Sequence, residues 1–465
     1  MEKSVLVSDS SEIKNAQENI FSKYAESYDN VVARTSFYRK LIRNAVRSLE
    51  GCSRVVDFGC ATGNLAIELA KKGIKVLAID NNAAMINVAR KKIEKEGLEN
   101  NIEVINADIT KVTLEDGTYD GAVMLNVMYL LDNPYDMIDK AYATLKKNGV
   151  LVASGPKPNQ NLKLLQKTIY QEFQRAGILE KFSKDIETVR GVNKILEKNI
   201  KHFFTTERLQ EILIDFAGFS DVIANDLMPG YRTYLGQGYF VAARKGVDYP
   251  NLSPEQVKIR LVKEDEVEKL YRIRYHFTKE KFKVLDSTAN HDAKMMEWDK
   301  FDDNSVHFVA EHDGKVLAAI RFVKDSKNLK LPADAQQNLD YLRKNGKVVW
   351  EPGRWIALPF APRGTGRKVL RAGYEYAKKQ GMTHIASIME IGSAKLYREM
   401  GFLLDKITSG KVDGYNTEAY IEISPVDNPP KFFTDEINDP AVLRFLESLE
   451  KDAMLVNHPV ILKNP

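Results

Sequence analysis

Over the first half of the chain, short apolar runs of strand length alternate with stretches whose apolar residues recur at helical spacing. Residues 64–72 have that helical spacing, and a later helix is expected to begin near Asn133. This alternation predicts an α/β fold with a doubly wound parallel sheet, whose ligands bind at the carboxyl ends of the strands. The runs that we interpret as strands span residues 55–57, 74–80, 101–108, 119–127 and 149–155.

The second half repeats strand and helix patterns in a different order. Alternating apolar residues on both sides of Asp313-Gly314 predict a hairpin, because this dipeptide favours a two-residue turn. The order is strand, helix, hairpin, strand, glycine-containing turn, helix and strand, which predicts a second α/β module. These elements lie at 257–262, 264–282, 305–323, 347–358, 361–366, 367–380 and 384–390.

Residues 244–256 separate the two patterns. They are polar, contain two prolines and lack periodicity, which is typical of a linker. The organisation that we predict is a first domain over 1–246, a linker over 247–257, a second domain over 258–424 and a C-terminal extension over 425–465. That extension is either a cap on the second domain or a tail that binds a partner.

The sequence VVDFGCATG, at 55–63, contains the first candidate site. A strand ends at Asp57, and small residues follow at every second position, at Gly59, Ala61 and Gly63. Such a turn lets the main chain approach a ligand closely, and a helix begins directly after it. The next strand ends in Asp80, whose carboxylate is suitably placed to accept hydrogen bonds from ribose hydroxyls.

With Asp108 and Asn126 at the following strand ends, this order resembles the class I S-adenosylmethionine-dependent methyltransferases. The resemblance implies a Rossmann-like sheet of seven strands that ends in an antiparallel pair, with S-adenosylmethionine as cofactor. It also implies that Gly59 and Gly63 flank the amino acid of the cofactor, that Asp80 holds the ribose, and that Asp108 lies by the adenine. Ala61 departs from the family pattern, in which glycine is usual.

The methyl acceptor is not readable from a motif, because methyl transfer depends mainly on positioning. The segment FSKYAESYD, at 21–29, resembles the helix that covers the cofactor in small-molecule methyltransferases. Tyr24 and Tyr28 in this segment, and Tyr129 after the fourth strand, are candidate substrate contacts, or else core residues. Residues 157–204 form a helical insertion that we expect to cover the acceptor.

The element order of the second module resembles the GNAT-type acyltransferases. Main-chain N–H groups at Gly364 and Gly366, with Arg363 beside them, are expected to bind a pyrophosphate or phosphopantetheine phosphate. Ala361 departs from the family, which usually has Arg or Gln there. Tyr397 matches a family tyrosine that commonly protonates the departing thiolate, or else it only packs on the cofactor arm.

A narrower resemblance is to the acyl-homoserine-lactone synthases and the long-chain N-acyl amino acid synthases, which have an acidic D-x-x-D, an arginine after the second strand and an E-x-x-R. It implies that Asp299 and Asp302 organise the amine side, that Arg321 supports them, and that Glu351 and Arg354 line the reaction centre. Glu351 is then the candidate base for the amine. Alternatively, these charges form a salt-bridge network that only holds the sheet edge.

The helix before this acidic motif is where the synthases place an arginine and an aromatic residue that clamp the substrate. Arg274 and Phe277 are the nearest candidates in this chain. Their spacing does not match the family pattern, so the identity of the amine stays open.

Composition excludes several classes of function. Lys and Arg number 68 against 64 for Asp and Glu and form no basic block, so nucleic acid is not expected as a partner. The two cysteines and seven scattered histidines predict neither a disulfide framework nor a metal site. No apolar stretch is long enough to cross a bilayer and the first residues lack a secretory signal, so we expect a soluble cytoplasmic protein.

The sequence therefore predicts a bifunctional enzyme that methylates one small molecule and transfers an acyl group from a thioester to an amine. The acyl donor is either acyl-coenzyme A or an acyl carrier protein, which would then be a partner. Two alternatives stay open: an acyltransferase with a regulatory domain that binds S-adenosylmethionine, and a non-catalytic scaffold with two pockets.

Overall fold

The computed structural model describes residues 24–158, 160–226, 237–283, 289–326, 329–335, 338–390, 394–402, 410–411 and 418–451. The chain divides into two compact units, Met1–Asp248 and Tyr249–Pro465, and each is described by itself. Residues 21–23 of the expected cover helix and 452–465 of the expected extension lie outside the described residues.

The first unit is built on a seven-stranded sheet with the strand order β3-β2-β1-β4-β5-β7-β6. Pairing is parallel from β3 to β5, whereas β7 is antiparallel to β5 and β6. This order confirms the predicted Rossmann-like, doubly wound fold with its final antiparallel pair. The strands are β1 (Arg54–Phe58), β2 (Lys75–Asp80), β3 (Ile102–Asn106), β4 (Tyr119–Leu125), β5 (Leu145–Pro156), β6 (Ser220–Asp226) and β7 (Gly238–Arg244).

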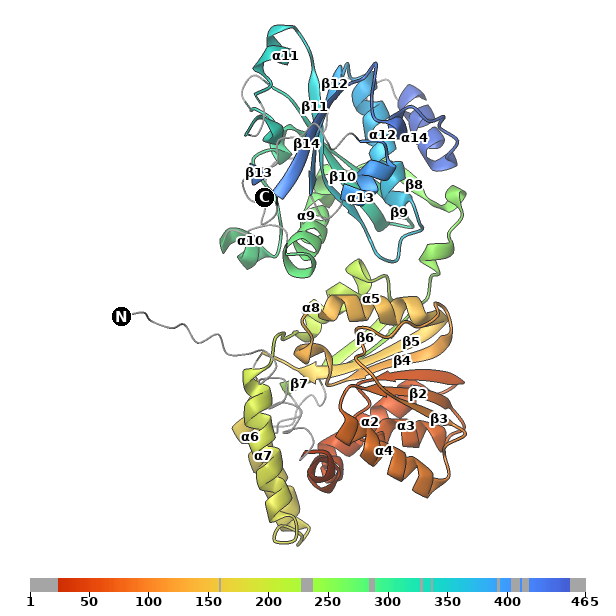
Figure 1. Ribbon diagram of the computed structural model, residues 1–465, viewed down its shortest axis with the longest axis vertical. Coiled ribbons are helices and arrows are strands. Elements are labelled where there is room, and N and C mark those ends of the chain that lie inside the picture. Colours follow the sequence, from red (N-terminus) through yellow and green to blue (C-terminus); the bar gives the residue numbers. More distant parts are fainter. Residues whose placement is uncertain are drawn as a thin grey trace, which may run out of the picture. The chain divides into compact units, whose positions relative to one another are not determined.

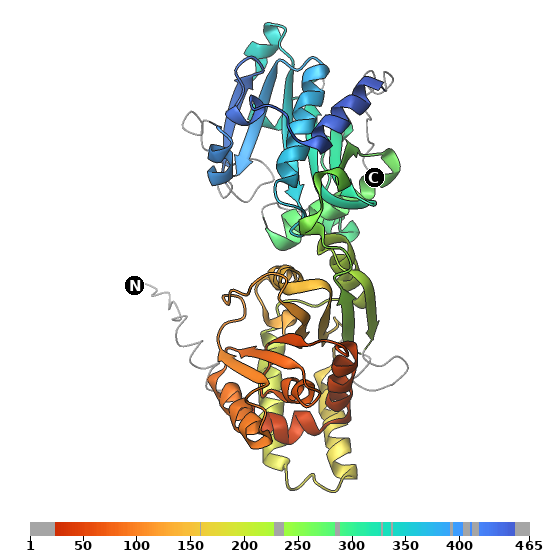
Figure 2. The same cartoon turned by 90° about the vertical axis from the view of Figure 1, so that its right-hand side faces the viewer.

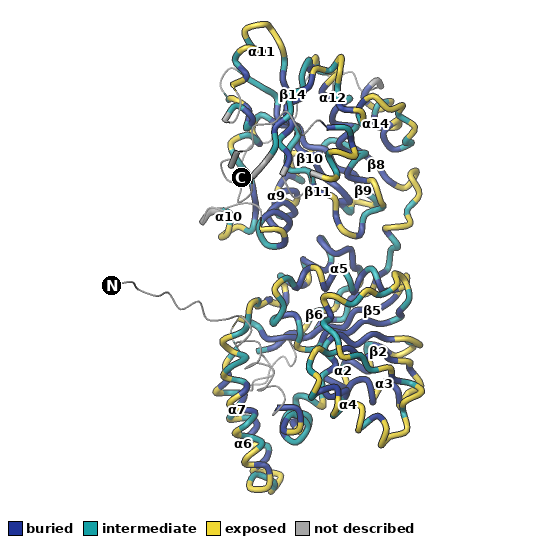
Figure 3. The backbone as a smooth tube through the Cα atoms, viewed as in Figure 1, coloured by how far each residue is buried: buried dark blue, intermediate teal, exposed yellow. Residues whose placement is uncertain are grey.

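Helices cover both faces of this sheet, with α2, α3 and α4 on one face and α5 and α8 on the other (Figure 1). The apolar faces of α2, α3 and α4 form one buried cluster with the strands, and Figure 3 shows the strands as mostly buried. The helices are α2 (Ser36–Ser48), α3 (Asn64–Ala70), α4 (Ala83–Glu96), α5 (Pro134–Thr144), α6 (Leu162–Arg175), α7 (Ser183–Lys198) and α8 (Thr206–Glu211), which continues as a π-helical turn over Ile212–Phe216.

The predicted helical insertion is the pair α6 and α7, which lie side by side between β5 and β6 in the chain (Figures 1 and 2). Asn161 caps α6 by accepting a hydrogen bond from the N–H of Leu164. The facing sides of the two helices form a second apolar cluster with the helical residues 24–31. The insertion is therefore joined to the N-terminal cover segment by apolar packing.

The second unit has its own seven-stranded sheet, ordered β13-β14-β12-β11-β10-β9-β8. Strands β8 to β11 are antiparallel neighbours, and β11 pairs with β12 in parallel only at Val349–His384 and Trp350–Ile385. The two strands are no longer paired beyond Trp350. The strands are β8 (Lys258–Leu261), β9 (Ser305–His312), β10 (Lys315–Lys324), β11 (Val349–Ala357), β12 (His384–Glu390), β13 (Gly410–Lys411) and β14 (Glu418–Pro425).

The hairpin that joins β9 and β10 turns at Asp313 and Gly314, both with positive φ, of 48° and 76°. This is the two-residue turn that the dipeptide predicts. The order of β8, helix, hairpin, β11, helix and β12 confirms the predicted GNAT-like arrangement. The helices are α9 (Val267–Tyr275), which continues as a π-helical turn over His276–Lys281, α10 (Ala289–Lys294), α11 (Asp340–Lys344), α12 (Thr365–Lys379), α13 (Ala394–Glu399) and α14 (Pro440–Lys451).

Helix α12 lies very close to β10. A Cβ at Gly373 would lie 2.3 Å from the ring of Phe322, so only glycine permits this approach. Helix α14 also packs on this unit, with the Phe445 ring 5.9 Å from that of Phe308 and a hydrogen bond from Arg444 to the carbonyl of Pro254 at 2.8 Å. Across the described residues, no helix combines the length and apolar character needed to span a membrane.

Candidate active sites

The glycine-containing turn of the first unit lies at the carboxyl ends of β1 and β2. The N–H of Gly59 donates to the carbonyl of Ile79 at 2.8 Å, and the N–H of Ala61 donates to the Asp80 carboxylate at 2.9 Å. A second Asp80 oxygen accepts from the N–H of Asn82 at 2.9 Å. Asp80 thus holds the glycine-containing turn beside the end of β2. The turn and the predicted ribose-binding carboxylate are therefore in direct contact.

Left-handed backbone conformations shape this turn. Gly59, Ala61 and Gly63 have φ of 77°, 48° and 74°. This region favours glycine, and the Cβ of Ala61 makes its conformation strained. Gly63 is the N-cap of α3, and a Cβ there would lie 3.2 Å from that of Ala89. Ala61 stands where the family usually has glycine, and its backbone keeps the left-handed conformation that glycine adopts easily.

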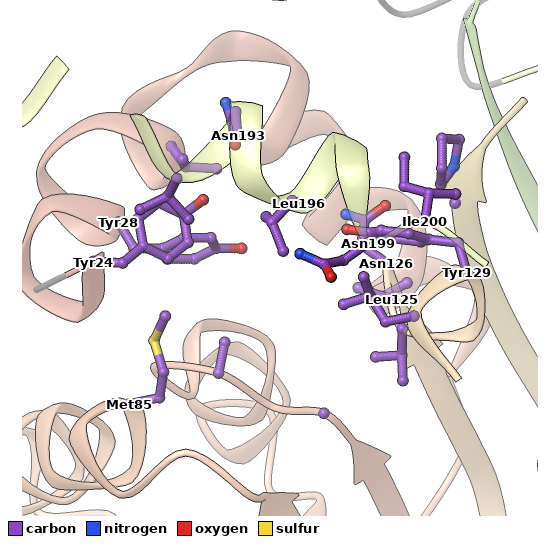
Figure 4. A pocket seen from close by; sticks show the side chains of 18 of the residues that line it. Tyr24, Tyr28, Met85, Leu125, Asn126, Tyr129, Asn193, Leu196, Asn199 and Ile200 are labelled. Carbon is purple, nitrogen blue, oxygen red and sulfur yellow. The ribbon is translucent and has the colours of Figure 1, made fainter. Parts of the chain in front are cut away.

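A cavity of about 500 Å³ lies beside the turn (Figure 4). Of the site residues predicted for the first unit, all except Gly63 line this cavity. The lining also includes apolar residues of α6 and α7, as expected for a cover of the acceptor site. The predicted residues that line it are Asp57, Gly59, Ala61, Asp80, Asp108, Asn126, Tyr24, Tyr28 and Tyr129.

The carboxylates on the cavity wall differ in their electrostatics. Burial, followed by the charge of Asp80, raises the pKa of Asp57 to about 7. Burial also raises the pKa of Asp80, whereas the hydroxyl of Thr110 lowers that of Asp108 by hydrogen bonding to it. Asp57 and Asp80 therefore resist ionisation at the same wall. A cation beside them would be stabilised, because it favours their charged forms.

Three tyrosines form an aromatic cluster over the cavity. The Tyr28 ring lies 5.3 Å from that of Tyr24 and 5.7 Å from that of Tyr38, both edge to face. Burial raises the pKa of Tyr28 well above its ordinary value and raises the pKa of Tyr129 to about 12. These phenols therefore keep their protons at neutral pH and can act as hydrogen-bond donors.

Asp29 links the cover segment to the glycine turn, a role that motif reasoning did not identify. Its carboxylate accepts hydrogen bonds from Thr62 at 2.7 Å, Asn64 at 2.9 Å and Lys92 at 2.6 Å. Ser27, on the same segment, donates to Asp185 of α7 at 2.8 Å. The sequence shows an acidic residue, Asp29, directly after Tyr28. It does not show the partners of Asp29, because they are more than thirty residues away in the chain.

In the second unit, the predicted charged residues form a compact, largely buried cluster. Arg321 lies 2.6 Å from Asp299 and 3.1 Å from Asp302, with Arg321 2% exposed and Asp302 fully buried. Arg354 lies 2.9 Å from Asp299 and 2.8 Å from Glu297, a partner that the motif comparison missed. Glu297 is the first residue of the acidic segment 297–302, to which the family resemblance assigned roles only at Asp299 and Asp302.

The arginines of the cluster keep Asp299 and Asp302 ionised. Burial by itself disfavours the charge on Asp302, but Arg274 and Arg321 outweigh it and hold the pKa of that carboxyl far below its usual range. In the same way, Arg321 and Arg354 lower the pKa of Asp299 against the effect of burial. Asp299 and Asp302 therefore form ion pairs with the arginines around them.

Arg274 and Phe277, the nearest candidates for the family's substrate clamp, lie inside the unit. Both are 1% exposed, and Arg274 donates to Asp302 at 2.8 Å inside the unit. Arg274 therefore anchors the acidic motif from α9, because its guanidinium is used inside the protein. The spacing between Arg274 and Phe277 does not match the family pattern, and the buried position of Arg274 does not offer its guanidinium to a substrate.

Glu351 lies apart from these ion pairs. It directly follows the last residue of β11 that pairs with β12, and its carboxylate accepts a hydrogen bond from the N–H of Ala333 at 2.9 Å. Burial raises its pKa to about 8. Among the described residues no ion pair includes Glu351, so the alternative of one salt-bridge network applies to Asp299, Asp302 and Arg354 but not to it.

The glycine turn of this unit precedes α12. Gly364 is the N-cap of α12, with a φ of 83° and open space where a Cβ would lie, and Arg363 is exposed beside it. The carbonyl of Gly366 accepts a hydrogen bond from the Trp355 indole at 2.8 Å. The Tyr397 ring lies 6.0 Å from the Trp355 ring, so Tyr397 and the turn share a neighbour.

Comparison with known proteins agrees with the division into two halves. Residues 55–149 match the family described as "Methyltransferase domain", and residues 270–409 match "N-acyl amino acid synthase FeeM". Carboxy-S-adenosyl-L-methionine synthase of Vibrio cholerae is 24% identical over 158 residues, which is 32% of this chain and 58% of the relative. A putative methyltransferase, YqeM of Bacillus subtilis, is 26% identical over 137 residues, or 29% of this chain and 54% of the relative.

Among solved structures, a methyltransferase from Thermotoga maritima described as a possible histamine N-methyltransferase is similar, at 22% identity. The match covers 49% of this chain and 99% of that one, with a TM-score of 0.33. The chain spans little more than half the length of the curated relatives named above. The family matches show that the chain combines a methyltransferase domain in its N-terminal half with an N-acyl amino acid synthase domain of GNAT type in its C-terminal half.

Proposed function

We propose that this protein is a two-activity enzyme of small-molecule biosynthesis. Its first half transfers a methyl group from S-adenosylmethionine, and its second half transfers an acyl group from a thioester to the amine of an amino-acid-like substrate. The observation that carries the proposal is that each unit has a buried carboxylate on a strand of its sheet. Asp57 lines the cavity of the first unit, and in the second unit Glu351 follows the last residue of β11 that pairs with β12.

The residues of the first site fit S-adenosylmethionine. Asp57 is 3% exposed and lines the cavity, and its raised pKa means that a cation beside it would be stabilised. The ammonium of the cofactor is such a cation. Asp80 is available at the same wall for the ribose hydroxyls, and Asp108 and Asn126 line the remainder. When bound, the cofactor supplies an electrophilic methyl group, which the protein only has to align with a nucleophile.

In the second site, Glu351 is the proposed base for the attacking amine. Its pKa of about 8 is close to the value at which a general base works best near neutral pH. Arg354 is on the same strand as Glu351, and Arg321 is on the neighbouring strand β10. Both arginines are held in position by Asp299. A fixed arrangement of this kind is suited to orient a polar substrate.

The acyl donor is proposed to bind at the turn before α12. The free N–H groups at the N-terminus of a helix attract phosphate, and Arg363 adds a positive charge there. This chemistry suits the phosphate of a pantetheine arm, on coenzyme A or on an acyl carrier protein. Tyr397 is the proposed acid for the departing thiolate, because it lies next to Trp355, which contacts the turn.

The test is a reconstitution with the full chain. Purified protein is given S-adenosylmethionine, an acyl-coenzyme A or acyl carrier protein thioester, and the common amino acids, and products are identified by mass spectrometry. Methylated and N-acylated products, lost separately in Asp80→Asn and Glu351→Gln, support the proposal. Cofactor binding without methyl transfer would instead support a regulatory first half, and failure of both ligands to raise the melting temperature would support a scaffold.

A further inference from the structure

The acceptor end of the first cavity is lined mainly by hydrocarbon. Helix α6 contributes Leu162, Leu165 and Ile169, and α7 contributes Val192, Ile195 and Leu196. In Figure 4, Leu196 lies between Tyr28 and Asn126, in the space that faces the strand ends. Burying an apolar group in such surroundings is favourable, because it removes hydrocarbon from water. This end of the cavity is therefore suited to an aliphatic part of a substrate.

The hydrocarbon-lined space is adjacent to a second cavity. A groove of about 310 Å³ lies between α6 and α7, and Ile169 and Asn193 line both cavities. Lys163, Lys167 and Arg190 stand around the groove. The two spaces are therefore neighbours, with Ile169 and Asn193 on the wall between them. The pair of helices can accommodate a substrate much longer than an amino acid.

Neutral polar groups line the cavity together with the carboxylates of the strand ends. Tyr28, Asn126, Tyr129 and Asn193 line the cavity, and the raised pKa values of the two tyrosines keep them as donors. The described lining contains no histidine, and its carboxylates are the three at the strand ends and the exposed Glu197. An alcohol or an ammonium would need a base to become a nucleophile, and the strand-end carboxylates are assigned to the cofactor. A carboxylate acceptor is already ionised.

We infer that the methyl acceptor is the carboxylate of a long-chain acyl compound, of the kind that the second half would release. The inference rests on the proposed function. A carboxylate oxygen attacks the methyl carbon, an O–CH₃ bond forms as the S–CH₃ bond breaks, and the electron pair returns to sulfur. The products are a neutral methyl ester and S-adenosylhomocysteine, and no proton is transferred. Methylation would then follow acylation and consume its product.

The first experiment compares acceptors. The full chain with S-adenosylmethionine is offered N-acetyl and N-dodecanoyl derivatives of the common amino acids, dodecanoic acid and the free amino acids. The inference expects methyl esters, with kcat/KM on the order of ten-fold or more higher for the dodecanoyl than for the acetyl compounds. Methylation of free amino acids at nitrogen, or equal rates for both chain lengths, overturns it.

The second experiment tests whether an acyl chain reaches the second cavity at Asn193. Asn193→Trp should lower kcat/KM for the dodecanoyl acceptor about ten-fold more than for the acetyl acceptor. Asn100→Trp, the same substitution on an exposed turn of the same unit, should change neither. Equal effects on both chain lengths in Asn193→Trp contradict a chain between α6 and α7.

Failure of the inference can be told from failure of the proposed function. Calorimetry of S-adenosylmethionine binding and an acylation assay are run on the same preparation. If both succeed and the methyl group goes to a short or cationic acceptor, only the inference is wrong. If the cofactor does not bind, the proposed methyl transfer itself is wrong.

Discussion

The carboxylate of Glu351 accepts a hydrogen bond from the main-chain N–H of Ala333 at 2.9 Å, with both residues buried. This bond lowers the pKa of Glu351, but burial raises it more, so the net value is about 8. The carboxylate is therefore oriented by the backbone and still able to exchange a proton near neutral pH. Ala333 lies outside every motif quoted for the family, so this pairing could not be read from the sequence.

Glu351→Gln tests the proposed base. The amide cannot accept a proton, so acyl transfer should fall by about 10²-fold to 10⁴-fold. In the unchanged protein, kcat/KM should rise with pH up to about 8, because the base must be ionised. Methyl transfer by the same preparation serves as the control, since Asp57 and Asp80 belong to the other unit. An unchanged acylation rate in Glu351→Gln rules out this role.

The same residue predicts a pH dependence of stability. Because its pKa rises from 4.5 to about 8 on folding, the folded state binds the proton more tightly than the unfolded state. The stabilisation is complete below the lower value and is lost as the pH rises through the higher one. Glu351→Gln should therefore gain stability relative to the unchanged protein between about pH 5 and about pH 8. A difference in melting temperature that does not vary with pH would contradict the assignment.

Asp302→Asn should destabilise the second unit. Asp302 lies 2.8 Å from Arg274 and 3.1 Å from Arg321, and its loss leaves buried positive charge unpaired, at a cost of about 3 kcal/mol or more. Urea unfolding followed by tryptophan fluorescence reports this unit alone, because all three tryptophans lie in it. Asp303→Asn, at the exposed neighbouring position, should cost far less. Similar costs for the two variants would show that the pairs contribute little.

Asp80→Asn addresses cofactor binding. The amide keeps one acceptor oxygen for the turn but loses the charge offered to the ribose, so the affinity for S-adenosylmethionine should fall by about ten-fold or more. Isothermal calorimetry measures this directly. Asp120→Asn is the matched control, because Asp120 accepts from the N–H groups of Ser53 and Arg54 at the start of β1. If both variants bind the cofactor equally well, Asp80 does not hold the ribose.

Ala61→Gly should stabilise the first unit. Ala61 has a φ of 48°, a conformation that costs an alanine about 1 kcal/mol relative to its preferred regions. Scanning calorimetry with S-adenosylmethionine should show a higher melting temperature for this unit. Ala83→Gly, at the exposed first residue of α4, should lower it, because there glycine replaces a helical alanine. A loss of stability in Ala61→Gly would mean that the methyl group makes contacts that offset its strain.

The fold followed from local patterns. The strand ends at Asp57 and Asp80, the alternating small residues and the Asp313-Gly314 turn are each encoded within a few neighbouring positions. Local encoding is sufficient for strands, helices and turns, because backbone conformation depends on nearby residues. The order of elements up to residue 390 was accordingly predictable, whereas strands β13 and β14 of the second sheet were not predicted. The nine residues of the first half that line the cavity were predicted from their motif positions.

The tertiary structure decided which distant side chains meet. Asp29 contacts Lys92, Arg354 contacts Glu297, and Arg274 turned out to be buried against Asp302. The groove between α6 and α7 likewise depends on how two helices pack. Contacts of this kind depend on packing and burial, to which residues far apart in the chain contribute jointly. The sequence by itself therefore determined the two architectures and their candidate residues, whereas the charge pairs, the raised pKa of Glu351 and the shape of the acceptor space arose only in three dimensions.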